Sequence, residues 1–233
     1  MMKYSKYFNV WLLLVSMSLV TACVTEDNAV DPGVPQDGEI TEFFNATVNK
    51  MIDENYEKVK ANGYAELVIP ASLYPKGMIK MPAADMEAMD YVIKAGHTVY
   101  INGGAVRDGV MGKELHDVDF STDATIDELL AIVPNSHKTM ASKVELVQAE
   151  HEDGMRTDMV PYRGMDIRLK DLSGVPESEY FGQAYSKYLI DDSFGRDLTI
   201  NSVYYDYKTG DIIDYHGGLH DIREKIIRTL YEP

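Results

Sequence analysis

Val99-Tyr-Ile-Asn-Gly-Gly-Ala-Val-Arg-Asp108 and, after a short linker, Asp117-Val-Asp-Phe-Ser-Thr-Asp-Ala124 are the two pieces of sequence that decide the fold. The first three residues have the composition of a short β-strand. Gly103-Gly104 then marks a place where the backbone turns tightly or approaches a ligand closely. The residues as far as Asp108 are typical of the first turn of a helix. An anion beside the glycines would therefore lie near open amide groups and the positive end of that helix.

The second piece contains an Asp-x-Asp pattern. Side chains two residues apart in a strand lie on the same face, which places Asp117 and Asp119 on one side and Val118 on the other. Neighbouring carboxylates repel unless a cation lies between them, and Mg²⁺ commonly joins one or two carboxylates to a substrate phosphate. Taken alone, a Gly-Gly pair is usually only a turn, and Asp-x-Asp is usually a solvated strand edge. Their order along the chain favours a nucleotide-phosphate and metal site.

Two later stretches add to this pattern. They are Phe194-Gly-Arg-Asp-Leu-Thr-Ile-Asn-Ser-Val203, and Asp211-Ile-Ile-Asp-Tyr-His-Gly-Gly-Leu-His-Asp-Ile222 followed by Lys225-Ile-Ile-Arg228. Together the motifs, which extend from about Met86 to Arg228, resemble the head, or catalytic, domain of the class II tRNA nucleotidyltransferase and bacterial poly(A) polymerase family, within the DNA polymerase beta superfamily. The resemblance implies an α/β (α+β) fold with a small mixed β-sheet flanked by helices, here with an N-terminal helical extension.

The resemblance also implies roles for individual residues. Asp117 and Asp119 would hold magnesium in a two-ion site. Thr157-Asp-Met-Val-Pro-Tyr-Arg163 is similar to a family segment that aligns Asp158 as a third catalytic and metal-binding carboxylate. The residues implied in nucleotide binding are Gly103, Gly104, Arg107, Asp108, Arg196, Asp197 and Asn201. For the last three the alternative is a salt bridge and a helix cap, and Gly195 stands where the family repeats arginine.

The N-terminus has the layout of an export signal. Lys3 and Lys6 precede an apolar run over Val10–Val20, and Leu19-Val-Thr-Ala-Cys23 closes it with the only cysteine of the chain. This resembles a bacterial lipoprotein signal, which implies a signal peptide over 1–22, a lipidated Cys23, and an exported protein anchored to a membrane. A transmembrane anchor is the alternative. Residues 23–40 are rich in small, polar and acidic residues and are interpreted as a flexible tether.

The charge of the chain bears on its partners. Acidic residues outnumber basic ones by 38 to 22, and the formal net charge is −16. Proteins that bind RNA tightly normally carry a basic stripe, because neutralising phosphates and releasing counterions supplies most of the affinity. The composition therefore disfavours RNA as a tightly bound partner without excluding it.

Hydrophobic spacing predicts the elements around the motifs. Residues 41–82 are interpreted as a helical and irregular extension, with a helix over Thr41–Lys60 and Thr41 as its N-cap. Residues 83–233 form the predicted head domain. Further helices are expected over Ala83–Ala95, Thr125–Val133, Ala184–Leu189 and Asp197–Ser202.

Two strands, Lys143–Glu150 and Met155–Tyr162, are expected to pair as a hairpin around Asp153-Gly154. Pro161 cannot donate a hydrogen bond to a sheet, so it predicts an edge strand or a bulge. His216 and His220 have helical spacing, but without four recognisable ligands they do not predict a zinc site.

These observations predict a magnesium-dependent nucleotidyltransferase-like protein that transfers a nucleoside monophosphate from a nucleoside triphosphate to an acceptor. The alternative is a catalytically inactive surface module of the same fold that binds nucleotide or metal. A metal-dependent glycosyltransferase that uses its Asp-x-Asp to hold a sugar nucleotide is a third possibility. The acceptor and the oligomeric state stay open.

Overall fold

The computed structural model describes residues 42–115, 118–141, 144–151, 156–164 and 185–230. All of them belong to one unit that spans Glu39–Pro233. The expected signal peptide, Cys23, the tether, Thr41, Asp117 and the turn at Asp153-Gly154 lie outside the described residues.

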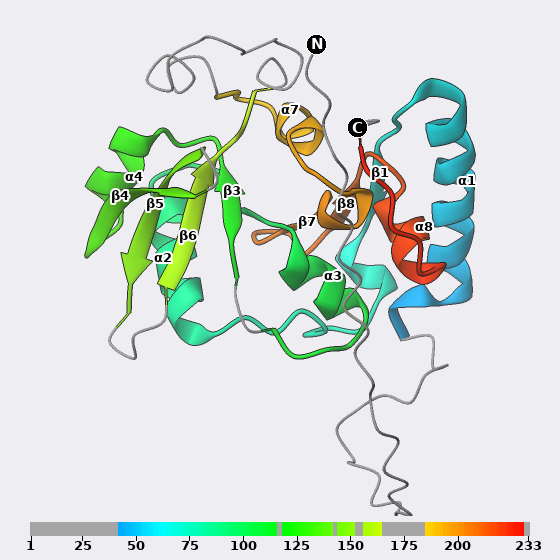
Figure 1. The fold of residues 1–233 in the computed structure, drawn as a ribbon. Helices are drawn as coiled ribbons and strands as arrows, with labels where there is room; N and C mark the ends of the chain where they lie inside the picture. Colours follow the sequence, from blue (N-terminus) through cyan, green and yellow to red (C-terminus); the bar gives the residue numbers. More distant parts are fainter. Residues whose placement is uncertain (1–41, 116–117, 142–143, 152–155, 165–184, 231–233) are drawn as a thin grey trace, which may run out of the picture. The chain divides into compact units, whose positions relative to one another are not determined.

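A mixed sheet of eight strands, in the order β1-β8-β7-β2-β3-β6-β5-β4, forms the centre of the domain (Figure 1). The strands are β1 (Leu67–Ile69), β2 (Tyr100–Ile101), β3 (Phe120–Thr122), β4 (Ser136–Ala141), β5 (Val144–Glu150), β6 (Arg156–Pro161), β7 (Val203–Asp206) and β8 (Ile212–Asp214). Neighbouring strands are antiparallel except β3 and β6, which run parallel with Phe120 opposite Met159.

Helices cover both faces of this sheet. They are α1 (Ala46–Asn62), α2 (Ala83–Lys94), α3 (Gly104–Val110), α4 (Ile126–Ile132), α7 (Leu189–Phe194) and α8 (Gly218–Arg223), with 3-10 turns η1 (Glu42–Phe44), η2 (Ala71–Leu73) and η4 (Thr199–Asn201). Buried side chains of α1, α2, α3, α4 and α8 join Val203 and other strand residues in the main core. The next strand residue, Tyr204, lies in a second cluster with α7. Because strand side chains alternate between faces, α7 covers the opposite side of the sheet.

The structure confirms the predicted fold class of a mixed sheet flanked by helices. Helix α2 begins at Ala83 as expected. Helix α4 begins after Thr125, where the side chains of Thr125 and Glu128 form a reciprocal capping box. Strands β5 and β6 pair antiparallel, which confirms the predicted hairpin.

Several expected boundaries were wrong for identifiable reasons. Helix α1 begins at Ala46, because the side chain of Asn45 accepts hydrogen bonds from two amides of the first turn. The helix expected over Asp197–Ser202 is reduced to η4, and the short helix expected near Ala184 begins only at Leu189. Strand β6 lies between β3 and β5, so it is not an edge strand. Pro161 is accommodated because the pairing of β6 with β5 ends at Met159, and the next hydrogen bond from β6 to β3 is donated by the Tyr162 amide to the Thr122 carbonyl.

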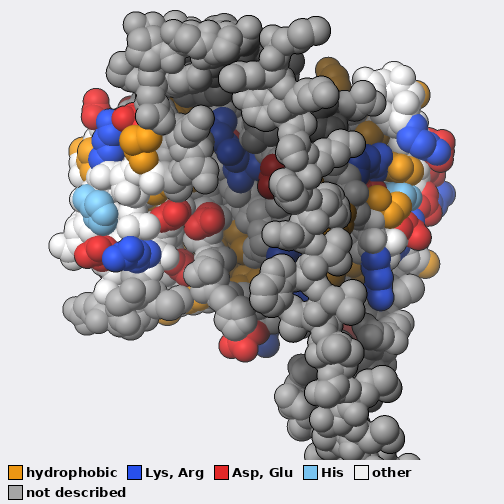
Figure 2. All heavy atoms as spheres, viewed as in Figure 1, with side chains coloured by type: hydrophobic (Ala, Val, Ile, Leu, Met, Phe, Trp, Pro, Cys, Tyr) orange, Lys and Arg blue, Asp and Glu red, His pale blue; other side chains and the backbone are white. Residues whose placement is uncertain are grey.

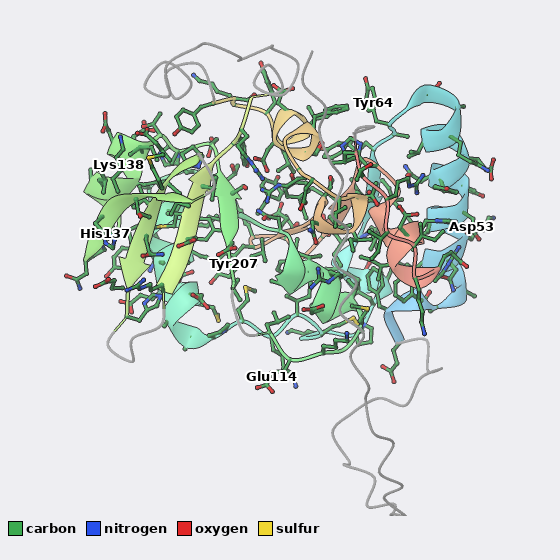
Figure 3. The ribbon with its side chains drawn as sticks, viewed as in Figure 1. Asp53, Tyr64, Glu114, His137, Lys138 and Tyr207 are labelled. Carbon is green, nitrogen blue, oxygen red and sulfur yellow. The ribbon has the colours of Figure 1, made fainter. Side chains whose placement is uncertain are left out.

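Residues 42–82 pack into the same core as the residues that follow them. Strand β1 pairs with β8 at one edge of the sheet, and Val48 and Ile52 of α1 are buried in the main core. On the outer side, Arg223 of α8 pairs with Asp53 of α1 at 2.6 Å (Figure 3), and Tyr56 stacks on His220. Helices α1 and α8 therefore stabilise each other through apolar and polar contacts.

In the part of the chain that the structure describes, the helices are all too short or too polar to cross a membrane.

We expect a pH dependence of stability from His216, which is buried and hydrogen-bonded to the Ser193 hydroxyl at 2.9 Å. Burial lowers the pKa of His216 to about 4. Between pH 6.5 and 4 the unfolded chain binds a proton at His216 that the folded chain does not, so stability falls as the pH falls. Urea unfolding should show a loss of about 2 kcal/mol in unfolding free energy between pH 7 and pH 5.

The His216→Gln variant is the control, because it removes the titrating group and keeps a side chain able to hydrogen-bond. Its loss of unfolding free energy between pH 7 and pH 5 should be much smaller. An equal loss in both proteins would show that another group causes the pH dependence.

Candidate functional site

A cavity of about 320 Å³ lies between the glycine turn and Asp119 of the Asp-x-Asp pattern. It is lined by Asn102, Gly104, Ala105, Arg107, Asp108, Leu115 and Asp119. Its size falls within the range of small-ligand pockets. The cavity thus brings together the glycine turn, the start of α3 and a carboxylate of the Asp-x-Asp pattern. Glu114, in the loop that carries Leu115, points away from the domain (Figure 3).

The glycine turn has the backbone conformation that its sequence requires. Gly103 has φ 67° and ψ −137°, in the region that favours glycine. It lies between the end of β2 and the first residue of α3, and its carbonyl accepts a hydrogen bond from the Arg107 amide at 3.3 Å. A backbone without side chains at Gly103 and Gly104 leaves room for a ligand to approach the main chain.

Two carboxylates lie at neighbouring positions of the sheet, Asp119 just before β3 and Asp158 in β6. Asp119 directly precedes Phe120, and Asp158 directly precedes Met159, the partner of Phe120 in the parallel pairing of β3 and β6. Phe120 and Met159 are both fully buried, so Asp119 and Asp158 face the opposite side of the sheet. Gln148 of β5, which pairs with Asp158 in the sheet, donates a hydrogen bond to its Oδ1 at 2.6 Å.

This donor set suits Mg²⁺, which needs only one or two carboxylates when substrate phosphates complete its coordination. Among the described residues, no group of three His, Cys, Asp or Glu side chains is arranged to hold a metal ion. Asp117 lies outside the described residues, so its predicted role stays a prediction.

Arg107, Asn201 and Asp197 form a chain of contacts between α3 and η4. The guanidinium of Arg107 donates from Nε to Asp108 at 3.0 Å and from Nη1 to Asn201 at 3.1 Å. Asn201 in turn donates to Asp197 at 3.2 Å. Arg107 and Asp108 line the cavity, and Asp197 is linked to Arg107 through Asn201. The structure therefore connects the motif after Gly103 with the motif around Asn201.

Arg196 lies in a buried polar network with Asp192. The side chain of Arg196 is only 12% exposed, and its Nη2 donates to Asp192 Oδ2 at 2.6 Å. This arrangement matches the salt bridge that was the alternative to nucleotide contact. Burial alone would raise the pKa of Asp192, but the charges of Arg196 and Arg163 outweigh burial and hold that pKa well below its usual range. Asp192 is therefore a carboxylate at neutral pH.

Sequence reasoning missed Asp192, Gln148 and Asn102 as parts of the site. Asp192 and Arg196 are four residues apart, a spacing at which opposite charges meet on a helix, and this was the available signal. Gln148 gave no signal, because its contact with Asp158 depends on the register of two strands.

The chain belongs to the poly A polymerase head domain family, whose sequence profile matches residues 99–228. It is 36% identical to the CCA-adding enzyme of Bacillus licheniformis over 144 residues, which are 60% of this chain and 33% of that protein. It is 30% identical to poly(A) polymerase I of Salmonella typhi over 154 residues, covering 60% of this chain and 30% of that one. The chain thus spans about a third of the length of these relatives.

Solved structures agree with this family assignment. The CCA-adding enzyme of Bacillus stearothermophilus in complex with CTP superimposes with a TM-score of 0.50 and 29% identity, covering 65% of this chain and 35% of that one. The CCA-adding enzyme of Thermotoga maritima complexed with tRNA has a TM-score of 0.51 at 20% identity and covers 71% of this chain and 37% of that chain. The second likeness supports the nucleotidyltransferase fold alone.

The two glycines allow a direct test of the turn. Gly103→Ala forces a residue with a Cβ into a positive φ and should lower the free energy of unfolding by about 1–2 kcal/mol. Gly104→Ala has an ordinary φ, and its Cβ would meet only the flexible end of Arg107, at 3.3 Å. Its unfolding free energy in urea should stay within about 1 kcal/mol of wild type. If Gly104→Ala were the more destabilised variant, this account of the turn would be wrong.

Proposed function

We propose that this domain is a magnesium-dependent nucleotidyltransferase that moves a nucleoside monophosphate from a nucleoside triphosphate to an acceptor hydroxyl. The cavity that joins the glycine turn, Arg107 and Asp119 is the observation that carries the proposal. The family assignment supports it independently. Nucleotidyl transfer depends mainly on positioning and on neutralising charge, and this site has groups suited to both.

The residues have distinct proposed roles. The backbone of Gly103 and Gly104 and the guanidinium of Arg107 would bind the phosphates. Asp119 and Asp158, with Asp117, would hold magnesium. The metal would neutralise phosphate charge and lower the pKa of the acceptor hydroxyl. Gln148 would keep the Asp158 carboxylate in one orientation through its 2.6 Å hydrogen bond.

Nucleoside triphosphate is the substrate class that we propose, and RNA is the acceptor to test first. The relatives at 30% identity or more include a CCA-adding enzyme and a poly(A) polymerase, and a CCA-adding enzyme 29% identical to this chain was solved in complex with CTP. On the face drawn in Figure 2, the described Lys and Arg side chains are interspersed with Asp and Glu and form no continuous stripe. Together with the net charge of −16, this favours weak contact with RNA.

The acidic net charge also favours a second candidate function, which is a module of the same fold that binds nucleotide or metal without turnover. The two functions are distinguished by transfer itself. Binding of nucleotide without transfer to any acceptor would favour the module.

The test is incorporation of label from each alpha-labelled nucleoside triphosphate, with magnesium and mixed RNA, by the chain without its first 23 residues. Asp119→Asn should lower incorporation about a thousandfold, because a lost metal ligand removes several kcal/mol of transition-state stabilisation. Asp127→Asn is the matched control, since Asp127 is an exposed carboxylate on α4. Equal incorporation by wild type and Asp119→Asn would rule out this site.

We also propose that residues 1–22 are a signal peptide and that Cys23 carries lipid, which would anchor the exported domain to a membrane. In a bacterial host fed labelled palmitate, the full chain should take up the label and partition with membranes. The Cys23→Ser variant should do neither at the same expression level. Label in both proteins, or a wild-type chain recovered unlabelled, would contradict the proposal.

A further inference from the structure

The buried guanidinium of Arg196 contacts two segments of the candidate site, at Asn102 before the glycine turn and at Ser121 on β3. Its Nη1 donates to Asn102 Oδ1 at 2.6 Å, and its Nη2 donates to Ser121 Oγ at 2.8 Å. Asn102 directly precedes Gly103, at the start of the glycine turn. Ser121 lies on β3, two residues after Asp119. One planar cation therefore ties the segment with the glycines to the strand that follows the carboxylate.

Asp192 fixes the guanidinium in this position. Its carboxylate is fully buried and accepts hydrogen bonds from Arg196 at 2.6 Å and from the backbone of Arg163 at 3.0 Å. Because arginine presents several donors in a rigid plane, a carboxylate at one edge determines where the other donors point. Those other donors reach Asn102 and Ser121.

Ser121 and Asn102 are also bonded to each other. The side-chain Nδ2 of Asn102 donates to Ser121 Oγ at 3.0 Å, and the Ser121 hydroxyl donates to Asp192 Oδ2 at 3.2 Å. Both residues are buried. Charge-assisted hydrogen bonds inside a protein are stronger than those in water. The network can thus hold β2 and β3 at a fixed spacing directly beside the cavity.

We propose that Asp192 and Arg196 form a positioning clamp that sets the glycine turn against the carboxylate strand. In this role Arg196 acts on the substrate only through Asn102 and Ser121. The inference rests on the proposed function for its catalytic consequence. The clamp itself is defined by contacts within the protein, so it can be tested without turnover.

Two hydroxyl groups provide a matched pair of variants. The Ser121 hydroxyl bonds to Asp192, Arg196 and Asn102, and so reaches the site. The Tyr204 hydroxyl also bonds to the ion pair, to Asp192 at 2.8 Å and to Arg196 at 3.3 Å. Among the described residues it forms no hydrogen bond with Asn102 or Ser121. Ser121→Ala and Tyr204→Phe therefore remove comparable buried contacts from the same ion pair.

The first measurement is amide hydrogen exchange at Arg107, whose amide donates to the Gly103 carbonyl at 3.3 Å and so reports on the glycine turn, in the protein without nucleotide. Ser121→Ala should exchange at the Arg107 amide about tenfold faster than wild type, since one net hydrogen bond corresponds to about that factor. Tyr204→Phe should exchange there at the wild-type rate, even if its melting temperature falls as much. Equal exchange in the two variants, whether both faster or both unchanged, would overturn the clamp. If Ser121→Ala does not fold, Asn102→Ala replaces it with the same expectation.

The second measurement separates the clamp from the proposed activity. If wild type transfers label, Ser121→Ala should lower kcat and raise the magnesium concentration needed for half activity, whereas Tyr204→Phe should change neither. If wild type is inert, the proposed function fails, and the exchange result alone decides the clamp. A Ser121→Ala protein with wild-type kcat and magnesium dependence would refute the positioning role.

Discussion

The parallel pairing of β3 with β6 is the constraint on which the site depends. It is the one parallel contact of the described sheet, and it places Asp119 and Asp158 at the same level of neighbouring strands. Strand β2 pairs with the other side of β3, with Ile101 opposite Phe120, so the glycine turn begins at that level too. A shift of one residue in the pairing of β3 with β6 would move one of the two carboxylates to the face where Phe120 and Met159 lie in the main core.

The buried ion pair of Asp192 and Arg196 complements the strand pairing. Burying Asp192 and Arg196 removes both charges from water, a cost that is offset only when good geometry and further hydrogen bonds satisfy them. Tyr204, Ser121, Asn102 and the Arg163 backbone supply those bonds. We infer that this network contributes less to net stability than to selecting one arrangement of the strands, which is the property that the proposed nucleotidyl transfer would need.

The sequence predicted the parts of the site that depend on local pattern. Gly103-Gly104 carries its geometry in a few consecutive residues, and the family resemblance supplied the fold. Of the Asp-x-Asp pattern the structure describes only Asp119, which lines the cavity, and the role of Asp117 stays a prediction. Strand β4 was missed, because Ser136–Ala141 is a largely polar edge strand whose structure comes from pairing with β5. The role of Arg196 could not be read from its motif. Its bonds to Asn102 and Ser121 depend on strands that lie far apart in the sequence, and its predicted contact with nucleotide stays a prediction.

The most direct test of the central claim is a crystal structure of the chain with Mn²⁺ and a non-hydrolysable CTP analogue. We predict an anomalous peak within coordination distance of the Asp119 carboxylate, and a triphosphate against the amides of Gly103 and Gly104. The same map should show Arg196 still bonded to Asn102. Nucleotide bound elsewhere on the domain, or metal bound away from Asp119, would contradict the assignment of this cavity as the nucleotidyltransferase site.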